Sequence, residues 1–98
     1  MHTKSATAVI TNPTEFAVAI KYEDDMVAPQ IVAKGTGWLA HRIKKIARRY
    51  NIPIFRRPKL ARRLFWAHEV GDYIKPEFYV EIASIIRDVI LRKAKNRR

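Results

Sequence analysis

The sequence predicts an α/β domain, with one small sheet of about four short strands and helices packed around it. Two observations predict this class. Short β-prone runs bounded by turn residues occupy the first third of the chain, and apolar residues with helical spacing follow them. The 98 residues, 48% of them apolar, are expected to form one domain around one modest core. Residues 1–7 and 93–98 are expected to be flexible.

Two runs near the N-terminus are predicted to pair as a hairpin. Ala8-Val9-Ile10 and Phe16-Ala17-Val18-Ala19-Ile20 are rich in residues that favour strands. Between them Asn12 precedes Pro13, and these are preferred residues at the first two positions of a tight turn. A third strand is predicted over residues 30–33, after Pro29 and before Gly35-Thr36-Gly37.

The apolar spacing changes after Thr36, which is a suitable helix N-cap. Apolar residues then recur three or four positions apart, which predicts an amphipathic helix that ends near Asn51. Its apolar stripe consists of Leu39, Ile43, Ile46, Ala47 and Tyr50. Its other face carries bases, namely Arg42, Lys44, Lys45, Arg48 and Arg49.

The second half is predicted to contain one more strand and two more helices. Residues 52–55 suit a short strand, and Pro53 places it at a sheet edge because proline cannot donate a ladder hydrogen bond. Pro58 suits the first turn of a helix that extends to Ala67. After Gly71 a last helix is expected to begin near Lys75-Pro76-Glu77, with a buried stripe of Phe78, Ile82, Ile85, Ile86 and Val89.

Composition excludes several classes of function. The chain has no cysteine, so it has no disulfide, no thiolate nucleophile and no cysteine-ligated zinc. No run of about 18 apolar residues is present, and residues 1–8 lack the apolar segment of a signal peptide. His2, His41 and His68 lack metal-site spacing and are interpreted as ordinary surface or interface residues. We expect no cofactor, no metal site and a cytosolic location.

The net charge of +11 is concentrated in the middle of the chain. Residues 34–63 contain eleven bases and no acid, which favours a polyanion, an acidic protein surface or anionic headgroups as partner. A solvated helix face is an equally ordinary explanation of such a run. The candidate partner-binding residues are Arg42, Lys45, Arg48, Arg49, Arg56, Arg57 and Arg62. Trp38, Phe65 and Trp66 are expected to be core or partly buried anchors, and would mark a partner site if exposed.

Five segments, in order, resemble one family. These are Thr11-Asn12-Pro13-Thr14 with the run that follows it, Ala28 to Gly35, Ile43 to Pro53, Pro58 to Phe65, and Val70 to Ile74 with Phe78-Tyr79. Together they cover roughly residues 8–90 and are similar to signature segments of the FlhB/YscU family of export-switch proteins. Each segment alone is weakly specific, whereas the ordered set is strongly specific.

The resemblance implies a function. Family members have this domain on the cytosolic side of the bacterial inner membrane, attached to a membrane domain, in flagellar or virulence export machines. The domain cleaves itself between the Asn and the Pro of its motif, which permits the switch from early to late export substrates. Carried over, Asn12 is the cleaving residue and Pro13 the new N-terminus. The implied partners are export-apparatus proteins, export substrates or their chaperones, and the chain's own membrane domain if it is a fragment. No multiple-turnover enzyme activity is implied.

The chemistry of an Asn-Pro bond agrees with that implication. Pro13 has no N–H with which to attack the Asn12 side chain, so the remaining cyclisation is attack of the Asn12 side-chain nitrogen on its own backbone carbonyl. This reaction needs a held geometry, a base and stabilisation of an oxyanion. Thr14 is expected to support the loop. Glu15 occupies the position where the family usually has histidine, and glutamate is the weaker base by about 2 pKa units, so we expect slow or incomplete cleavage.

Two other functions remain open from the sequence. A basic nucleic-acid-binding module fits the charge and the interleaved Arg and aromatic residues, but no recognised nucleic-acid-binding motif is present. A hydrolytic enzyme is weakly supported, since the sequence has no paired carboxylates, catalytic triad or phosphate loop.

Overall fold

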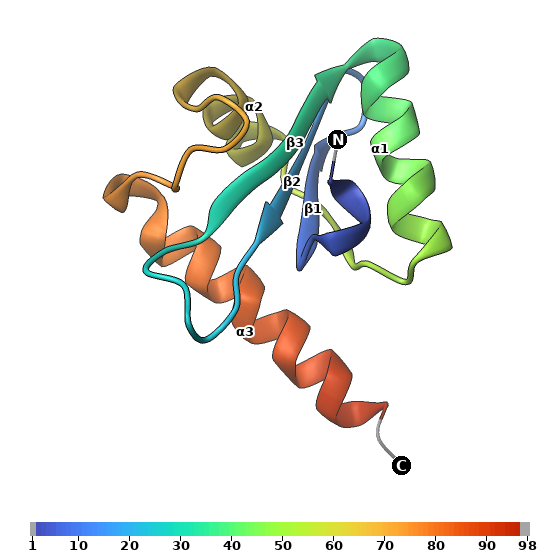
Figure 1. Cartoon of the computed structure of the whole chain (residues 1–98). Coiled ribbons are helices and arrows are strands. Elements are labelled where there is room, and N and C mark those ends of the chain that lie inside the picture. Colours follow the sequence, from blue (N-terminus) through green and yellow to red (C-terminus); the bar gives the residue numbers. More distant parts are fainter. Residues whose placement is uncertain (1, 97–98) are drawn as a thin grey trace.

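The computed structural model describes residues 2–96, in which four strands form one mixed sheet with α-helices on both faces (Figure 1). The strands are β1 (Ala8–Asn12), β2 (Phe16–Lys21), β3 (Gln30–Thr36) and β4 (Ile54–Arg56). The helices are α1 (Gly37–Arg49), α2 (Pro58–Ala67) and α3 (Tyr79–Lys95), with the short 3-10 turns η1 (Thr3–Ser5) and η2 (Pro76–Phe78). The predicted α/β class is confirmed.

The sheet order is β3-β2-β1-β4. β1 and β2 form the predicted antiparallel hairpin, with Ala8 opposite Ile20 and Asn12 opposite Phe16. β4 is an edge strand, as predicted, and begins directly after Pro53. It pairs in parallel with β1, so β1 is held between two strands.

The two faces of the sheet bury different residues. Large side chains of β1 and β2, such as Ile10, Phe16 and Val18, pack under α2 and α3. Small ones, such as Ala17 and Ala19, pack under α1. Successive side chains of a strand point to opposite faces of the sheet, and both faces are covered here. β1 and β2 are therefore buried almost throughout, and they appear in the sequence as continuous apolar runs.

Both ends of α1 follow from local sequence. At its start, a Cβ on Gly35 would lie 2.5 Å from Leu39 Cγ, so glycine permits the close approach of strand and helix. Thr36 occupies the N-cap position, although its side chain makes no capping hydrogen bond. At the other end Asn51 has a φ of 57°, the left-handed conformation that asparagine tolerates, and the Ile52 N–H bonds to the Ala47 carbonyl at 2.8 Å.

Several burial predictions are wrong. Trp38 and Trp66 are 74% and 72% exposed, because each is offset by two residues from a buried position of its helix stripe. Tyr50 lies beyond the end of α1 and is 50% exposed. His68, interpreted as a surface or interface residue, is 2% exposed. Phe65 is partly buried, as predicted.

The terminal segments have regular structure within the described residues. η1 places Thr3 in a buried position, and α3 continues to Lys95, past the body of the domain (Figure 1). The flexibility of residues 1–7 and 93–98 stays a prediction, and residues 1, 97 and 98 lie outside the described part. Across residues 2–96, no helix combines the length and apolar character needed to cross a membrane.

Candidate functional site

Residues 12–15 form a tight turn between β1 and β2. The Glu15 N–H donates to the Asn12 carbonyl oxygen at 3.0 Å, the bond between the first and fourth residues of a β-turn. Pro13 and Thr14 are the central residues, and proline favours the backbone angle that the second position needs. Because β1 lies between β2 and β4, the turn is attached to the middle of the sheet.

The Asn12 side chain is 9% exposed and is oriented by Thr14. Its Oδ1 accepts hydrogen bonds from the Thr14 N–H at 3.4 Å and from the Thr14 hydroxyl at 3.2 Å. A backbone N–H can only donate, so the amide atom that faces it is the oxygen. The nitrogen Nδ2 is therefore the other end of the amide, turned away from Thr14.

Glu15 contacts both neighbouring helices. Its carboxylate lies 3.8 Å from the Arg62 guanidinium of α2, and both side chains are more than half exposed. Its carbonyl accepts from the Gly37 N–H, the first residue of α1, at 3.2 Å. The backbone N–H of Glu15, rather than its carboxylate, is hydrogen-bonded to Asn12.

An aromatic cluster connects the turn to α2. Phe16, the residue after the turn, lies 4.9 Å from Phe65 and 6.2 Å from Trp66, measured between ring centroids. Phe65 and Trp66 are 5.0 Å apart and nearly perpendicular. α2 thus supports one side of the turn.

The C-terminal end of α2 is capped by side chains that the sequence analysis did not identify. Lys34 of β3 donates to the carbonyls of Phe65 at 2.9 Å and His68 at 2.7 Å. His68 Nε2 accepts from the Lys75 N–H at 3.0 Å, so Nδ1 carries the hydrogen that it donates to Leu64 O at 3.0 Å. The one available signal was a lysine inside the otherwise apolar run 31–35.

The predicted basic residues fall into two groups. Arg42, Lys45, Arg48 and Arg49 are exposed on α1, which covers one face of the sheet. The other three are exposed at the end of the sheet that carries the turn, with Arg56 at the end of β4, Arg57 at the N-cap of α2 and Arg62 on α2. The Arg57 N–H donates to the carbonyl of Thr11, next to Asn12, at 3.0 Å.

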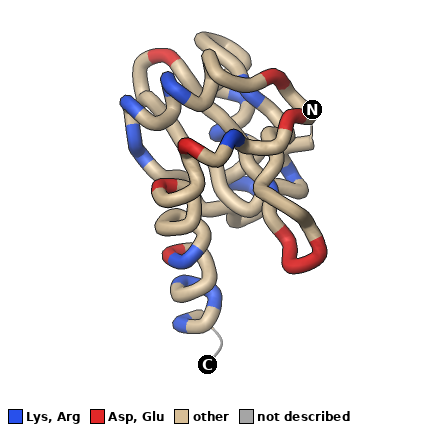
Figure 2. Tube along the Cα trace, turned by 90° about the vertical axis from the view of Figure 1, so that its left-hand side faces the viewer, with Lys and Arg blue, Asp and Glu red and all other residues tan. Residues whose placement is uncertain are grey.

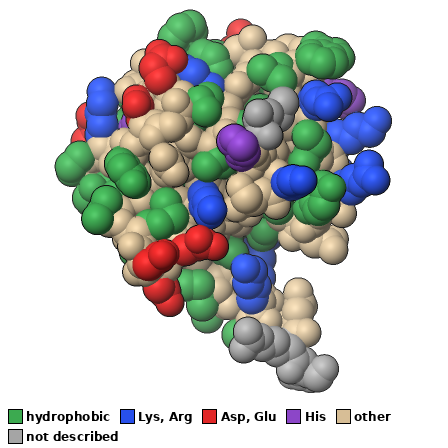
Figure 3. All heavy atoms as spheres, viewed as in Figure 1, with side chains coloured by type: hydrophobic (Ala, Val, Ile, Leu, Met, Phe, Trp, Pro, Cys, Tyr) green, Lys and Arg blue, Asp and Glu red, His purple; other side chains and the backbone are tan. Residues whose placement is uncertain are grey.

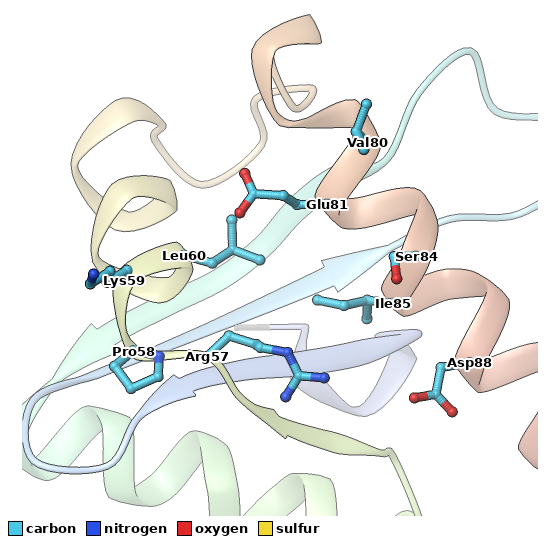
Figure 4. Close-up of a pocket in the computed structure, with 9 residues that line it drawn as sticks. All are labelled: Arg57, Pro58, Lys59, Leu60, Val80, Glu81, Ser84, Ile85 and Asp88. Carbon is cyan, nitrogen blue, oxygen red and sulfur yellow. The ribbon is translucent and has the colours of Figure 1, made fainter.

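A groove of about 610 Å³ separates α2 from α3 (Figure 4). Leu60 and Ile85 point toward each other across it, and the Arg57 guanidinium extends toward α3. A second groove, of about 440 Å³, lies between α3 and the loop that follows β2, and its lining includes Val27, Pro29, Ile86 and Ile90. Neither groove was predicted from the sequence, because both depend on how distant segments pack.

No group of three or more His, Asp or Glu side chains within residues 2–96 is arranged to hold a metal ion. The side chains that the structure brings together are those of the turn and of α2.

Residues 1–89 match the family model described as the FlhB HrpN YscU SpaS Family. The flagellar biosynthetic protein FlhB of Aquifex aeolicus is 50% identical over 91 residues, which are 92% of this chain and 26% of that protein. FlhB of Bacillus subtilis is 40% identical over 91 residues, 92% of this chain and 25% of that protein. The chain thus spans about a quarter of the length of these curated relatives.

Solved structures agree with this match. The cytoplasmic domain of FlhB from Shewanella putrefaciens superimposes with a TM-score of 0.87 at 29% identity, covering 98% of this chain and 78% of that one. An EscU C-terminal domain with a substituted asparagine superimposes with a TM-score of 0.86 at 30% identity, covering 89% of this chain and 88% of that one. The chain therefore belongs to the FlhB HrpN YscU SpaS family, whose members are components of flagellar and type III export machines.

Proposed function

We propose that this chain is an export-switch domain on the cytosolic face of the bacterial inner membrane. It cleaves its own Asn12–Pro13 bond and so permits the change from early to late export substrates in a flagellar or type III machine. The observation that carries the proposal is the geometry of the turn, in which Thr14 holds Oδ1 of Asn12 and the Glu15 N–H holds the Asn12 carbonyl.

The turn supplies parts of the reaction. Asn12 Nδ2 loses a proton to a base and attacks the Asn12 backbone carbon, and the carbonyl oxygen becomes the oxyanion of a tetrahedral intermediate. The Glu15 N–H, 3.0 Å from that oxygen, stabilises the developing charge. Collapse of the intermediate breaks the bond to Pro13, whose nitrogen takes a proton and leaves as a secondary amine. A succinimide remains at Asn12 and is later opened by water.

Glu15 is the reason to expect a slow reaction. A glutamate is a weaker base than the histidine usual at this position of the family, and a general base works best when its pKa lies near the working pH. Here the carboxylate is also exposed and engaged by Arg62. Thr14 still orients the Asn12 side chain, so we expect cleavage to occur slowly rather than to be abolished.

The direct test is substitution of Asn12. Asn12→Ala removes the attacking nitrogen and should abolish cleavage, as followed by intact mass. Asn12→Asp is the matched control, because it keeps the oxygen that Thr14 contacts while lacking the amide nitrogen, and it should be equally inactive. Fragments that persist in Asn12→Ala would exclude the succinimide route. Both variants should fold, since loss of a turn contact costs about 1 kcal/mol.

Export-apparatus proteins, export substrates or chaperones are the proposed partners at Arg56, Arg57 and Arg62. This group adjoins the turn, and Arg62 contacts Glu15 directly, so cleavage would change the surface that a partner meets. Charge reversal at Arg56 and Arg57 should impair secretion while leaving the fold intact, because exposed charges contribute little to stability.

A further inference from the structure

The outward side of α1 has a regular basic and aromatic pattern. Trp38, Arg42, Lys45 and Arg49 are spaced four, three and four residues apart, so they form one line along the helix. His41, Arg48 and Tyr50 are exposed beside this line. We name these seven residues the α1 face. Figure 3 shows the corresponding Lys, Arg and His side chains along the right-hand edge, with no acidic side chain among them.

The bases of the α1 face have no acidic partners within the described residues. Each ion pair of residues 2–96 lies elsewhere, for example Arg63 with Glu81 at 2.9 Å and Arg92 with Asp88 at 3.2 Å. From the side of α2 and α3, Figure 2 accordingly shows acidic and basic residues mixed. Lys4 of η1 adds another base, since it lines a shallow depression together with Arg49 and Tyr50. The α1 face is therefore a continuous positive surface whose charge is not neutralised by the protein itself.

Exposed aromatic rings occupy both ends of this surface. Trp38 is 74% exposed in the first turn of α1, and Tyr50 is 50% exposed just after its last residue. The Arg42 guanidinium lies 5.9 Å from the Trp38 ring centroid, so the ring is beside the positive charge rather than in the core. Trp and Tyr favour the headgroup level of a bilayer, because their rings have an apolar body and a polar edge.

We propose that the α1 face binds anionic phospholipid headgroups, with α1 lying flat on the membrane surface. Each Lys or Arg near an anionic surface contributes favourably, and the aromatic rings anchor the two ends of the helix among the headgroups. A nucleic-acid duplex would use the same charges through its phosphates, but its stacked bases would leave the two exposed rings without a partner. The proposal does not depend on cleavage at Asn12.

The two tryptophans provide a fluorescent probe on each face of the sheet, so the response of one can be compared with that of the other. Trp66→Phe leaves Trp38 as the only tryptophan, and Trp38→Phe leaves Trp66, which is equally exposed but lies on α2, on the other face of the sheet. Each variant of the 98-residue chain is titrated with vesicles of phosphatidylcholine alone and of phosphatidylcholine with phosphatidylglycerol. Trp38 should shift to shorter emission wavelength and be quenched by brominated acyl chains only with phosphatidylglycerol, and Trp66 should not respond.

Charge reversal distinguishes vesicle binding through the α1 face from attraction by the overall charge of the protein. Arg42→Glu/Lys45→Glu/Arg49→Glu should weaken partitioning to the anionic vesicles by about a hundredfold. The control variant changes the net charge by the same amount on the other side of the sheet, with the substitutions Arg57→Glu/Lys59→Glu/Arg62→Glu. It should weaken partitioning to the anionic vesicles only a few-fold in physiological salt, because distant charges are screened. Melting temperatures near wild type show that both variants are folded.

Three outcomes would overturn the proposal. They are equal losses in the two triple variants, a response of Trp66 rather than Trp38, and equal binding to vesicles without phosphatidylglycerol. Displacement from the vesicles by random duplex DNA in physiological salt would instead assign the α1 face to nucleic acid.

Discussion

The two sides of the sheet differ in what they bury and in what they show to solvent. Under α1 the sheet buries small residues such as Ala17 and Ala19 beside aliphatic ones such as Ile43, and the bases of the α1 face make no ion pair within residues 2–96. The other side buries large residues such as Phe78 and Leu64, and several of its exposed charges form ion pairs, for example Arg63 with Glu81 and Arg92 with Asp88. The turn at Asn12 depends mainly on this second side, through Phe16 and Arg62. Side-chain contacts to the turn are therefore concentrated on the α2 side, whereas the bases of the α1 face make no ion pair within residues 2–96.

The largest expected difference is in core substitutions. Leu64 of α2 is completely buried against the sheet, so Leu64→Ala should lower the free energy of unfolding by about 3–5 kcal/mol. Ala47 of α1 is equally buried, and Ala47→Gly should lower the free energy of unfolding by only about 1 kcal/mol. Urea denaturation measures both. Equal losses in the two variants would contradict the expected difference.

Lys→Met substitutions at two positions provide a matched comparison, with a smaller expected effect on stability. Lys34→Met removes the ammonium that caps the carbonyls of Phe65 and His68, and should lower the free energy of unfolding by about 2–3 kcal/mol. Lys45→Met on α1 removes a charge that makes no ion pair within the described residues. It should change the free energy of unfolding by less than about 0.5 kcal/mol. Similar thermal stabilities for the two variants would contradict this role of Lys34.

The smallest of these effects concerns the rate of cleavage. Glu15→His places a base suited to neutral pH beside the turn and should speed cleavage by about tenfold. Glu15→Gln, which removes the base, is the control and should not speed it. The time course of fragment formation measures both, and an unchanged rate in Glu15→His would show that residue 15 is not the base.

Local sequence patterns were sufficient for the strands, the helices and the turn. The β-prone run that contains Val9 and Ile10 and the helical spacing of Ile43 and Ala47 are properties of neighbouring residues, and a sequence shows them directly. Proline chemistry likewise identified residues 12–15 and the edge position of β4. The family resemblance is confirmed, and it rested on five ordered segments rather than on one motif.

Features that depend on distant contacts were not predictable. The parallel pairing of β4 with β1, the burial of His68 and the cap provided by Lys34 each join segments far apart in the chain. The exposure of Trp38 and Trp66 was predicted wrongly because aromatic residues are usually buried, whereas helix phase places these two outside the stripes. The basic run was expected to form one face, but its residues lie on elements that cover opposite sides of the sheet.

Intact mass of the purified wild-type chain over time tests the central claim most directly. The account predicts slow conversion to two fragments that part after Asn12 and elute together under native conditions, because β1 stays paired with β2 and β4. While the succinimide persists, the two fragment masses sum to that of the intact chain, and after hydrolysis they exceed it by one water. A chain that stays whole, or that breaks at another bond, would contradict the proposed self-cleavage.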